Sequence, residues 1–328
     1  MRFLLDDEQR EFARSLDSML TAADTPGAVR AWAAGDTTPG RELWTRLAEA
    51  GVFALAVPER HDGLGPLPVE TTVAFTELGR HAVPGPLVET VAAAALLDAL
   101  GDTGATALLP QIATGKAVVS LCVPALGGPY ALDADAADAV LLVEGDTVRL
   151  AEAAGPVQPS ADPARRLARP LGGTVLAKGP AVTAATAHAA EVAALATAAQ
   201  CLGLGRALLD RTVEYVGQRR QFGVAIGSFQ AVKHRLADTL IALEFARPLL
   251  HSAALALAEG ADHHSAEIAA AKVTAGEAAY AAARTALQLH GAVGYTEELD
   301  LALWIRKARP LRDAWGTPAA CRARVLAS

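Results

Sequence analysis

Cysteines and aromatic residues are scarce in this sequence, and basic residues are never grouped in a long run. The 328 residues include three cysteines, Cys122, Cys201 and Cys321, whose scattered positions give neither a metal-ligand spacing nor a disulfide framework. This usage is typical of a reducing compartment, so we expect the protein in the cytoplasm. With 29 Lys and Arg against 36 Asp and Glu, the net charge is -7, which gives nucleic-acid binding no electrostatic support.

Long apolar runs are also absent. No stretch of about 18 uninterrupted apolar residues occurs, because the Ala- and Leu-rich run that begins near Val91 soon reaches Asp98. The first residues, which include Asp6, Asp7 and Glu8, lack the apolar region of a signal peptide. We therefore expect no membrane insertion.

Hydrophobic residues are abundant: they make up 52% of the chain, enough for a large core in two or three domains. The pattern changes twice along the sequence. Residues 1–115 read as short helices, residues 116–182 as short strands among Pro, Gly and Asp, and residues 183–328 as long helices. The expected fold is mainly α with a small β domain: an N-terminal helical domain, a reduced middle β domain and a C-terminal four-helix bundle.

The individual elements are predicted from residue spacing. Apolar, β-branched runs between turn residues predict strands at residues 117–123, 139–143, 147–150 and 174–177. The second and third of these flank a Glu-Gly-Asp turn and form a hairpin. Apolar residues at helical spacing predict long helices at residues 189–216 and 265–290, and their many alanines favour close helix packing.

A short polar and aromatic segment, Arg219-Arg220-Gln221-Phe222-Gly223, separates two of the helical patterns, and Phe229-Gln230 follows it. Two guanidinium groups suit forked hydrogen bonds to a phosphate or pyrophosphate. Phe222 offers an apolar ring, Gly223 permits a turn or a close approach to a ligand, and Gln230 adds an amide. The segment predicts contact with a phosphate-bearing ligand; an arginine pair before a glycine is also typical of a solvated helix end.

A second segment, Gln288-Leu289-His290-Gly291-Ala292-Val293-Gly294-Tyr295-Thr296, follows the next helical hairpin. The two segments together resemble the acyl-CoA dehydrogenase family, which carries Arg-x-x-Phe-Gly, then Phe-Gln, and later Gln-x-x-Gly-Gly-x-Gly-Tyr/Phe. Residues 44–51, 57–65 and 77–80 agree with the N-terminal part of that family. The resemblance covers nearly the whole chain except its middle region, and it implies the same domain order.

In that family FAD lies between the β domain and the C-terminal bundle of one subunit, and an adjacent subunit covers its ADP half. The resemblance therefore implies FAD as the cofactor, and it carries cofactor contacts over to Arg219, Phe222, Gly223, Gln230, Gln288, Gly291 and Thr317. Ala292 replaces the usual second Gly of the later segment, which should narrow the approach of the backbone to the cofactor. No group of residues indicates a metal site.

The catalytic base of the family is missing. The reaction removes a proton from Cα of an acyl-CoA while a hydride leaves Cβ for the flavin, so a carboxylate must sit over Cα. Trp315 stands where many members have this Glu, and a Trp side chain cannot take the proton. Ala193 stands near the alternative position, and Glu191 is rotated roughly 200° away from it on a helix. The sequence therefore predicts no catalytic residue.

The middle region departs from the family as well. In place of a Thr-Glu-Pro-x-x-Gly-Ser segment that binds the flavin ring, it has Val123-Pro124-Ala125-Leu126-Gly127-Gly128. No Trp occurs between Trp44 and Trp304, where the family has a Trp-containing strand. The half of the site that binds the ring and the thioester is thus reduced, whereas the half that covers ADP is retained.

This selective loss predicts one subunit of a heteromeric enzyme. The chain resembles the smaller, base-less subunit of the α2β2 acyl-CoA dehydrogenases of actinobacterial steroid side-chain degradation. That resemblance implies a larger catalytic partner subunit, an acyl-CoA substrate such as a steroid side-chain CoA, and an electron-transfer acceptor. Two alternatives stay open: a self-sufficient homomeric flavoenzyme with an unconventional base, Asp313 or Glu191, and a non-catalytic structural subunit without flavin.

Four other polar groups are weaker candidates. His263-His264 follows Asp262 at an expected helix start, where capping or solvent contact is favoured over metal binding. His290 is expected either to pack beside the cofactor or to contact it. His234 and Asp238, one turn apart, are typical of a surface pair. We predict a solvated face for the basic patch Arg306, Lys307, Arg309 and Arg312. The functional alternative is contact with CoA phosphates or with an acidic partner.

Overall fold

The first third of the chain is helical in the computed structural model, which describes residues 4–101 and 103–327. Asp6 caps the first helix and closes a capping box with Gln9, and Asp24 caps the second. The helices are α1 (Asp7–Thr21), α2 (Thr25–Ala34), α3 (Thr38–Glu49), α4 (Pro68–Arg80), α5 (Leu87–Leu100) and α6 (Leu108–Ala113), with 3₁₀ turns η1 (Ala54–Ala56) and η2 (Glu59–His61).

The middle of the chain forms a small four-stranded sheet in the order β1-β3-β4-β8. β1 (Val119–Cys122) runs parallel to β3 (Ala139–Glu144), and β3 forms the expected antiparallel hairpin with β4 (Thr147–Leu150). β4 then pairs with β8 (Thr174–Lys178), which confirms the last predicted strand. The remaining elements of this region are α7 (Pro124–Gly127), β2 (Ala131–Leu132) paired with β6 (Leu167–Ala168), and β5 (Ala153–Ala154) paired with β7 (Pro170–Leu171).

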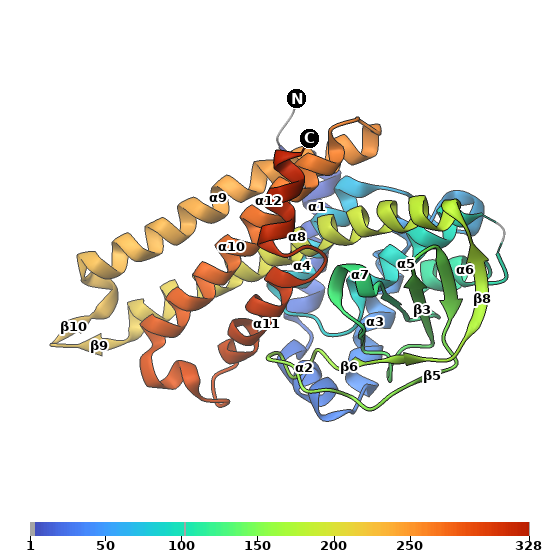
Figure 1. The fold of residues 1–328 in the computed structure, drawn as a ribbon. Helices are drawn as coiled ribbons and strands as arrows, with labels where there is room; N and C mark the ends of the chain where they lie inside the picture. The colour runs from blue at the N-terminus through green and yellow to red at the C-terminus, as the bar shows by residue number, and fades with distance from the viewer. Residues whose placement is uncertain (1–3, 102, 328) are drawn as a thin grey trace.

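Long helices form the last part of the chain (Figure 1). They are α8 (Pro180–Gln218), α9 (Gln230–Glu259), α10 (His264–His290), α11 (Leu301–Asp313) and α12 (Pro318–Leu326). Between them lie β9 (Arg220–Gln221), β10 (Val224–Ala225) and the 3₁₀ turns η3 (Ile226–Ser228) and η4 (Gly291–Tyr295). The expected order of helices, small sheet and helical bundle is therefore confirmed.

Helix α8 is longer than the sequence pattern indicated, because it begins at Pro180 and not near Ala189. Its first turns are largely exposed and carry small residues, so apolar spacing does not mark them. Farther along, α8 crosses α4 at very close range. A Cβ on Gly203 would lie 1.8 Å from Thr76 O, and one on Gly79 would lie 2.1 Å from Gln200 O. Glycine at both positions lets the two backbones meet.

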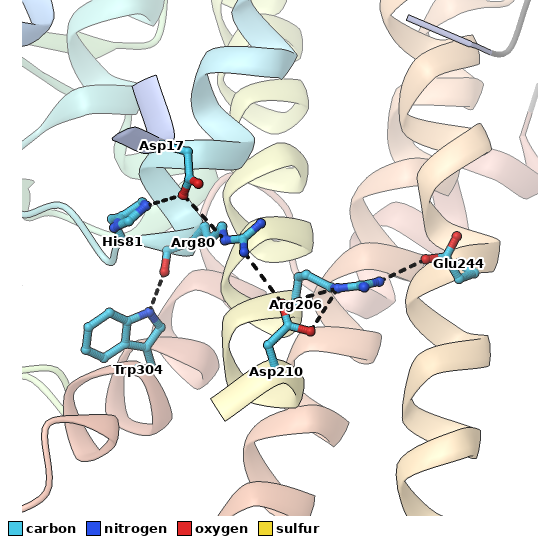
Figure 2. Close-up of polar contacts among 7 residues, drawn as sticks. All are labelled: Asp17, Arg80, His81, Arg206, Asp210, Glu244 and Trp304. Atoms are coloured by element: carbon cyan, nitrogen blue, oxygen red, sulfur yellow. Dashed lines mark hydrogen bonds and ion pairs between the residues drawn. The ribbon is translucent and has the colours of Figure 1, made fainter. Parts of the chain in front are cut away.

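A chain of charged side chains ties the N-terminal helices to the bundle, as Figure 2 shows. Asp17 on α1 accepts from His81 Nε2 at 2.8 Å and lies 3.7 Å from Arg80 Nε. The Arg80 guanidinium lies 3.7 Å from Asp210 on α8, and Arg80 O accepts from Trp304 Nε1 at 2.8 Å. The network continues from Asp210 through Arg206 to Glu244 on α9.

By length and composition alone, α8 and α9 are apolar enough to cross a membrane. In α8, 89% of the apolar window is buried inside the fold, as expected of the core helix of a globular domain. In α9 only 33% of that window is buried. Helix α9 therefore leaves apolar side chains on the surface, and Ile241, Phe245 and Leu249 form a stripe at spacings of four residues.

Candidate functional site

The first candidate segment lies at the tip of the bundle, where β9 and β10 form a hairpin between α8 and α9 (Figure 1). Phe222 and Gly223 make its two-residue turn with φ values of 52° and 82°, the left-handed conformation that such hairpins favour. The Phe222 side chain is 91% exposed and meets the ring of Phe229 edge-on at 6.3 Å. Arg219 precedes this hairpin, and Gln230 begins α9 behind it.

Helix α10 brings the second segment to the same end of the bundle. α9 and α10 run antiparallel, and the hydroxyls of Thr239 and Thr285 lie 3.5 Å apart across their contact. The C-terminal end of α10 therefore lies beside the start of α9, with Gln288 exposed and Gly291 at φ +63°. The structure thus joins six of the seven predicted cofactor contacts in one place. Their contact with FAD stays a prediction.

A groove of about 610 Å³ runs between α9 and α10 at this end. Gln288 lines it, and so do the guanidinium-bearing residues Arg235 and Arg284, together with Asp238 and Tyr295. Arg284 precedes Gln288 by one helical turn and shares its face of α10. Sequence patterns did not single out Arg235 or Arg284; the i, i+4 spacing to Gln288 was the available signal for Arg284.

The tip of the bundle is cationic although the whole chain carries a net charge of -7. Among the described residues, no ion pair within 4 Å compensates any of five basic side chains there, Arg219, Arg220, Lys233, Arg235 and Arg284. Most other arginines in the chain do have a carboxylate partner. Cations left unpaired on one surface favour an anionic ligand such as a phosphate group.

Thr317 is not part of this site. It caps α12, where its hydroxyl accepts from Ala320 N at 3.3 Å. The preceding Gly316 O accepts from Lys272 Nζ at 3.3 Å. Lys272 lies 16 residues before Gln288 on α10, which is about 24 Å along the helix axis. The structure therefore separates Thr317 from the other six predicted contacts.

The position expected for a catalytic base lies at the junction of α11, α5 and the small sheet. Trp315 adopts φ 52°, unusual for a bulky residue, and its indole Nε1 donates to Glu89 Oε1 at 3.0 Å. Glu89 belongs to α5 and is only 4% exposed. Burial raises the pKa of the Glu89 carboxyl, while Arg165 and the Trp315 hydrogen bond oppose that rise.

Two cavities meet at this junction, and Trp315 borders both. The outer cavity, about 230 Å³, is lined by Glu89, Tyr130, Arg165 and Asp313 together with apolar side chains. The inner cavity is about 20 Å³, the size of one water molecule. Glu89, Arg165 and Trp315 line both of them, so the junction holds polar groups next to solvent-accessible space.

The alternative base positions are accounted for by other contacts. Ala193 is fully buried in α8 and carries no ionisable group. Glu191 points elsewhere: its Oε2 lies 3.0 Å from His264 Nε2. The hydrogen bonds that His264 donates to Ala261 O and to the Glu191 carboxylate raise the pKa of its imidazole. The pair explains both residues without a metal or a substrate.

Two family models match the chain in separate segments. The N-terminal domain of acyl-CoA dehydrogenase matches residues 6–116, and the C-terminal domain matches residues 183–328. The Acyl-CoA dehydrogenase IpdE2 of Mycobacterium tuberculosis is 34% identical over 306 residues, which cover 92% of this chain and 91% of the relative. The IpdE2 of Mycolicibacterium smegmatis is 32% identical, with 95% and 96% covered. The chain belongs to the acyl-CoA dehydrogenase family.

Solved structures agree with this assignment to the acyl-CoA dehydrogenases. A variant of the steroid ACAD Tcur3481-Tcur3483 superposes with a TM-score of 0.84 and 25% identity, covering 98% of this chain and 97% of that one. The ChsE4-ChsE5 complex of Mycobacterium tuberculosis gives a TM-score of 0.82 over 100% of this chain and 98% of that one. At 24% identity, the second match shows the fold alone.

The residues at the tip suit the ADP half of the family's flavin cofactor. Unpaired guanidiniums match a pyrophosphate, and the groove volume is that of a ligand site. Gly291 has open space where a Cβ would stand, so a ligand can approach its backbone. At the junction, where the resemblance predicts the ring-binding half, Trp315 donates to Glu89 and the short helix α7 follows β1.

The basic patch on α11 is mostly satisfied within the chain. Lys307 forms a buried ion pair with Asp162 at 2.9 Å, and Arg306 pairs with Glu297. Arg312 pairs with Asp313 at 3.0 Å. The fourth residue of the patch, Arg309, is exposed, and no ion pair involves it among the described residues, so only the other three are satisfied within the chain.

Proposed function

We propose that this chain is one subunit of an FAD-dependent acyl-CoA dehydrogenase and that it covers the ADP half of a flavin held by a larger, unlike subunit. One observation carries the proposal. The tip residues lie far from the chain's own junction cavity: Gln200, which lines the inner cavity, and Arg219 are 19 residues apart on α8, about 28 Å along its axis. The tip faces outward, where a second chain can present its cofactor.

At that tip each side chain has a role. Arg219 would hold the pyrophosphate, with Arg220 adding charge, and Phe222 would lie against the adenosine. Gln230 and Gln288 would donate or accept hydrogen bonds along the ADP half, and Gly223 and Gly291 would let the backbone approach. When bound, the flavin accepts the hydride that leaves Cβ of the acyl group.

The base for this reaction would come from the partner subunit. Trp315 and Ala193 occupy the two positions where the family places its Glu, and Glu191 is held by His264. Asp313 lines the outer cavity but is paired with Arg312. We further infer a partner-facing surface on α9, because its exposed apolar stripe contains Phe245, which is 70% exposed.

Two structural neighbours support a heteromer and a steroid substrate. One neighbour is named as a steroid ACAD of two components, and the other as a complex of two chains. By analogy we propose a bulky acyl-CoA such as a steroid side-chain CoA, and an electron-transfer acceptor for the reduced flavin. The three cysteines are free and buried, which suits a reducing cytoplasm.

The test is co-expression with a candidate large subunit, for example the product of a neighbouring reading frame. The flavin spectrum and the mass of the purified complex are measured for the natural chain, for Arg219→Ala and for Arg14→Ala, an exposed control on α1. The expected result is a yellow α2β2 complex that loses flavin only with Arg219→Ala. Unchanged flavin would indicate a structural subunit instead, and a yellow homomer of this chain alone would overturn the heteromer.

A further inference from the structure

Three side chains of the N-terminal helices lie close enough together to bind one metal ion. Glu77 and His81 are one turn apart at the C-terminal end of α4, and Asp17 reaches them from α1. One ligand atom from each residue, two carboxylate oxygens and an imidazole nitrogen, lies within 4.8 Å of the other two. The sequence gives no sign of this group, because Asp17 and His81 are 64 positions apart.

Glu77 is the member of the group that the fold leaves without a partner. Its Oε2 atom is buried, and no hydrogen bond reaches that atom in residues 4–101 and 103–327. No ion pair within 4 Å involves Glu77 among the same residues, although its neighbours Arg80 and His81 both pair with Asp17. A buried carboxylate oxygen without a donor costs free energy, and a bound cation compensates for that cost.

His81 is in the form that binds metal. Burial lowers the pKa of its imidazole, which favours the neutral ring, and a neutral ring nitrogen is the metal ligand. His81 also forms the C-cap of α4, so the partial negative charge at that helix end favours a cation beside it. Its Nε2 atom lies 2.8 Å from Asp17 Oδ1, as Figure 2 shows.

Two arginines face the group and oppose a cation there. The Arg80 guanidinium lies 3.7 Å from Asp17 and also 3.7 Å from Asp210, and its side chain is 41% exposed, so it can keep Asp210 as its partner. Arg211 is held over the Trp304 ring, with its guanidinium carbon 3.8 Å from the ring centroid. The two carboxylates of the group balance the charge of a divalent ion.

We propose that Asp17, Glu77 and His81 form a zinc-binding site that fastens α1 to the end of α4. One imidazole and two carboxylates suit Zn²⁺, whereas Mg²⁺ and Ca²⁺ prefer oxygen ligands alone. Bonds of about 2.0–2.2 Å to zinc place the ligand atoms about 3.4 Å apart, so small side-chain rotations close the site. The Asp17 side chain is 42% exposed, which leaves room for water as the fourth ligand.

A network of ion pairs without metal would explain the contacts of Asp17, Arg80 and His81. It would not explain Glu77 Oε2, which is buried beside these groups and receives no hydrogen bond. The zinc site uses no residue of the tip or of the junction cavities, so it does not depend on the proposed function.

The test is zinc binding by the purified full chain, after treatment with EDTA and removal of the chelator. Isothermal titration with ZnCl₂ should show one site per chain, and titration with MgCl₂ should show none. We expect Glu77→Gln and His81→Gln each to raise the Kd for Zn²⁺ about tenfold or more, because the loss of even a residue that supports a ligand has an effect of that size. Zn²⁺ should raise the melting temperature of the natural chain, since it binds the folded state alone, and should raise that of the two variants much less.

His263→Gln is the matched control. His263 Nε2 lies 3.1 Å from Glu267 Oε1 at the same spacing of four residues, and among the described residues no third ligand joins this pair. The control should bind Zn²⁺ as the natural chain does. A Kd that rises equally with His263→Gln and with His81→Gln would overturn the proposal, because any exposed His–carboxylate pair would then account for the binding.

Glu77→Gln separates loss of the site from loss of the fold. In metal-free buffer this variant should keep the circular dichroism spectrum and the melting temperature of the natural chain or exceed that temperature, since it replaces a buried carboxylate oxygen that has no partner. Absence of one-site binding by the natural chain, or an unchanged Kd in folded Glu77→Gln, would overturn the zinc site. Either result leaves the heteromer untouched, because that proposal is tested by flavin content after a change at Arg219.

Discussion

Tyr215 on α8 stacks on His290 on α10, with ring centroids 4.0 Å apart and planes inclined by 22°. This contact joins the two segments that the sequence predicted to act together, because Tyr215 lies one turn before Arg219 and His290 lies between Gln288 and Gly291. His290 Nδ1–H donates to Ala286 O at 2.8 Å. His290 is thus buried under the tip, where its ring packs against Tyr215.

The stack should stabilise the tip measurably. Offset aromatic pairs contribute about 0.5–1.5 kcal/mol beyond the area they bury. We expect Tyr215→Leu to lower the free energy of unfolding by about 1 kcal/mol, and Tyr215→Phe, which keeps the ring, to change it little. Urea denaturation followed by circular dichroism measures both. Equal losses in the two variants would mean that the hydroxyl, and not the stack, provides the stability.

Glu77 should make stability fall as pH rises. Burial, the largest cause, raises the pKa of its carboxyl to about 7, against an opposing charge on Arg80. The pKa of Glu77 is higher in the folded state than in the unfolded state. The stability that Glu77 contributes is therefore fully present below pH 4.5 and is lost as pH rises through about 7. Glu77→Gln removes the titration. The free energy of unfolding of Glu77→Gln, relative to that of the natural chain, should therefore increase from pH 5 to pH 8 by up to about 3 kcal/mol.

Urea denaturation of both proteins at the two pH values measures this difference. Asp17→Asn is a useful comparison, since Asp17 is half-exposed and its charge contributes to the raised pKa of Glu77. A constant difference between the natural chain and Glu77→Gln at pH 5 and pH 8 would contradict the prediction.

Much of this architecture could be predicted because its determinants are local. The hairpin of β3 and β4 follows from two apolar runs around Gly145, and α10 was predicted to within one residue from its alanine-rich periodicity. Helix α8 was predicted too short because its first turns are exposed and carry little apolar spacing. A period of apolar residues marks only the part of a helix that packs against a core.

The junction could not be predicted, because its contacts join residues far apart in the sequence. Glu89 and Trp315 are 226 positions apart, and the local sequence around neither residue indicates their hydrogen bond. Lys307 appeared to belong to an exposed basic patch, whereas Asp162 from the middle region reaches it in the fold. Only an isolated Glu within the apolar run of α5 gave a hint, since such a residue needs a partner.

Removing one partner of the Lys307–Asp162 pair should lower the free energy of unfolding strongly, whereas replacing both with apolar residues should change it little. Both side chains are nearly buried, at 11% and 2% exposed, and the charged atoms lie 2.9 Å apart. Removing one partner leaves a buried charge uncompensated, which costs about 3–5 kcal/mol. We expect Asp162→Leu alone to lose that amount, and the double change with Lys307→Met to recover most of it. A double-mutant cycle by urea denaturation tests this; additive losses would rule out coupling between the two charges.

The apolar stripe on α9 should govern association with the partner subunit. Phe245 is 70% exposed, and its neighbours one turn away, Ile241 and Leu249, extend the same surface. Phe245→Glu places a charge where a partner would remove water, so we expect the heteromer to weaken at least tenfold in Kd while the chain itself keeps its melting temperature. Val175→Glu on β8 is the control, since Val175 is 47% exposed on the small sheet. Native mass spectrometry over a dilution series separates the outcomes. If Phe245→Glu and Val175→Glu assemble as well as the natural chain, α9 is not the interface, and the flavin-sharing contact must be made through the tip of the bundle alone.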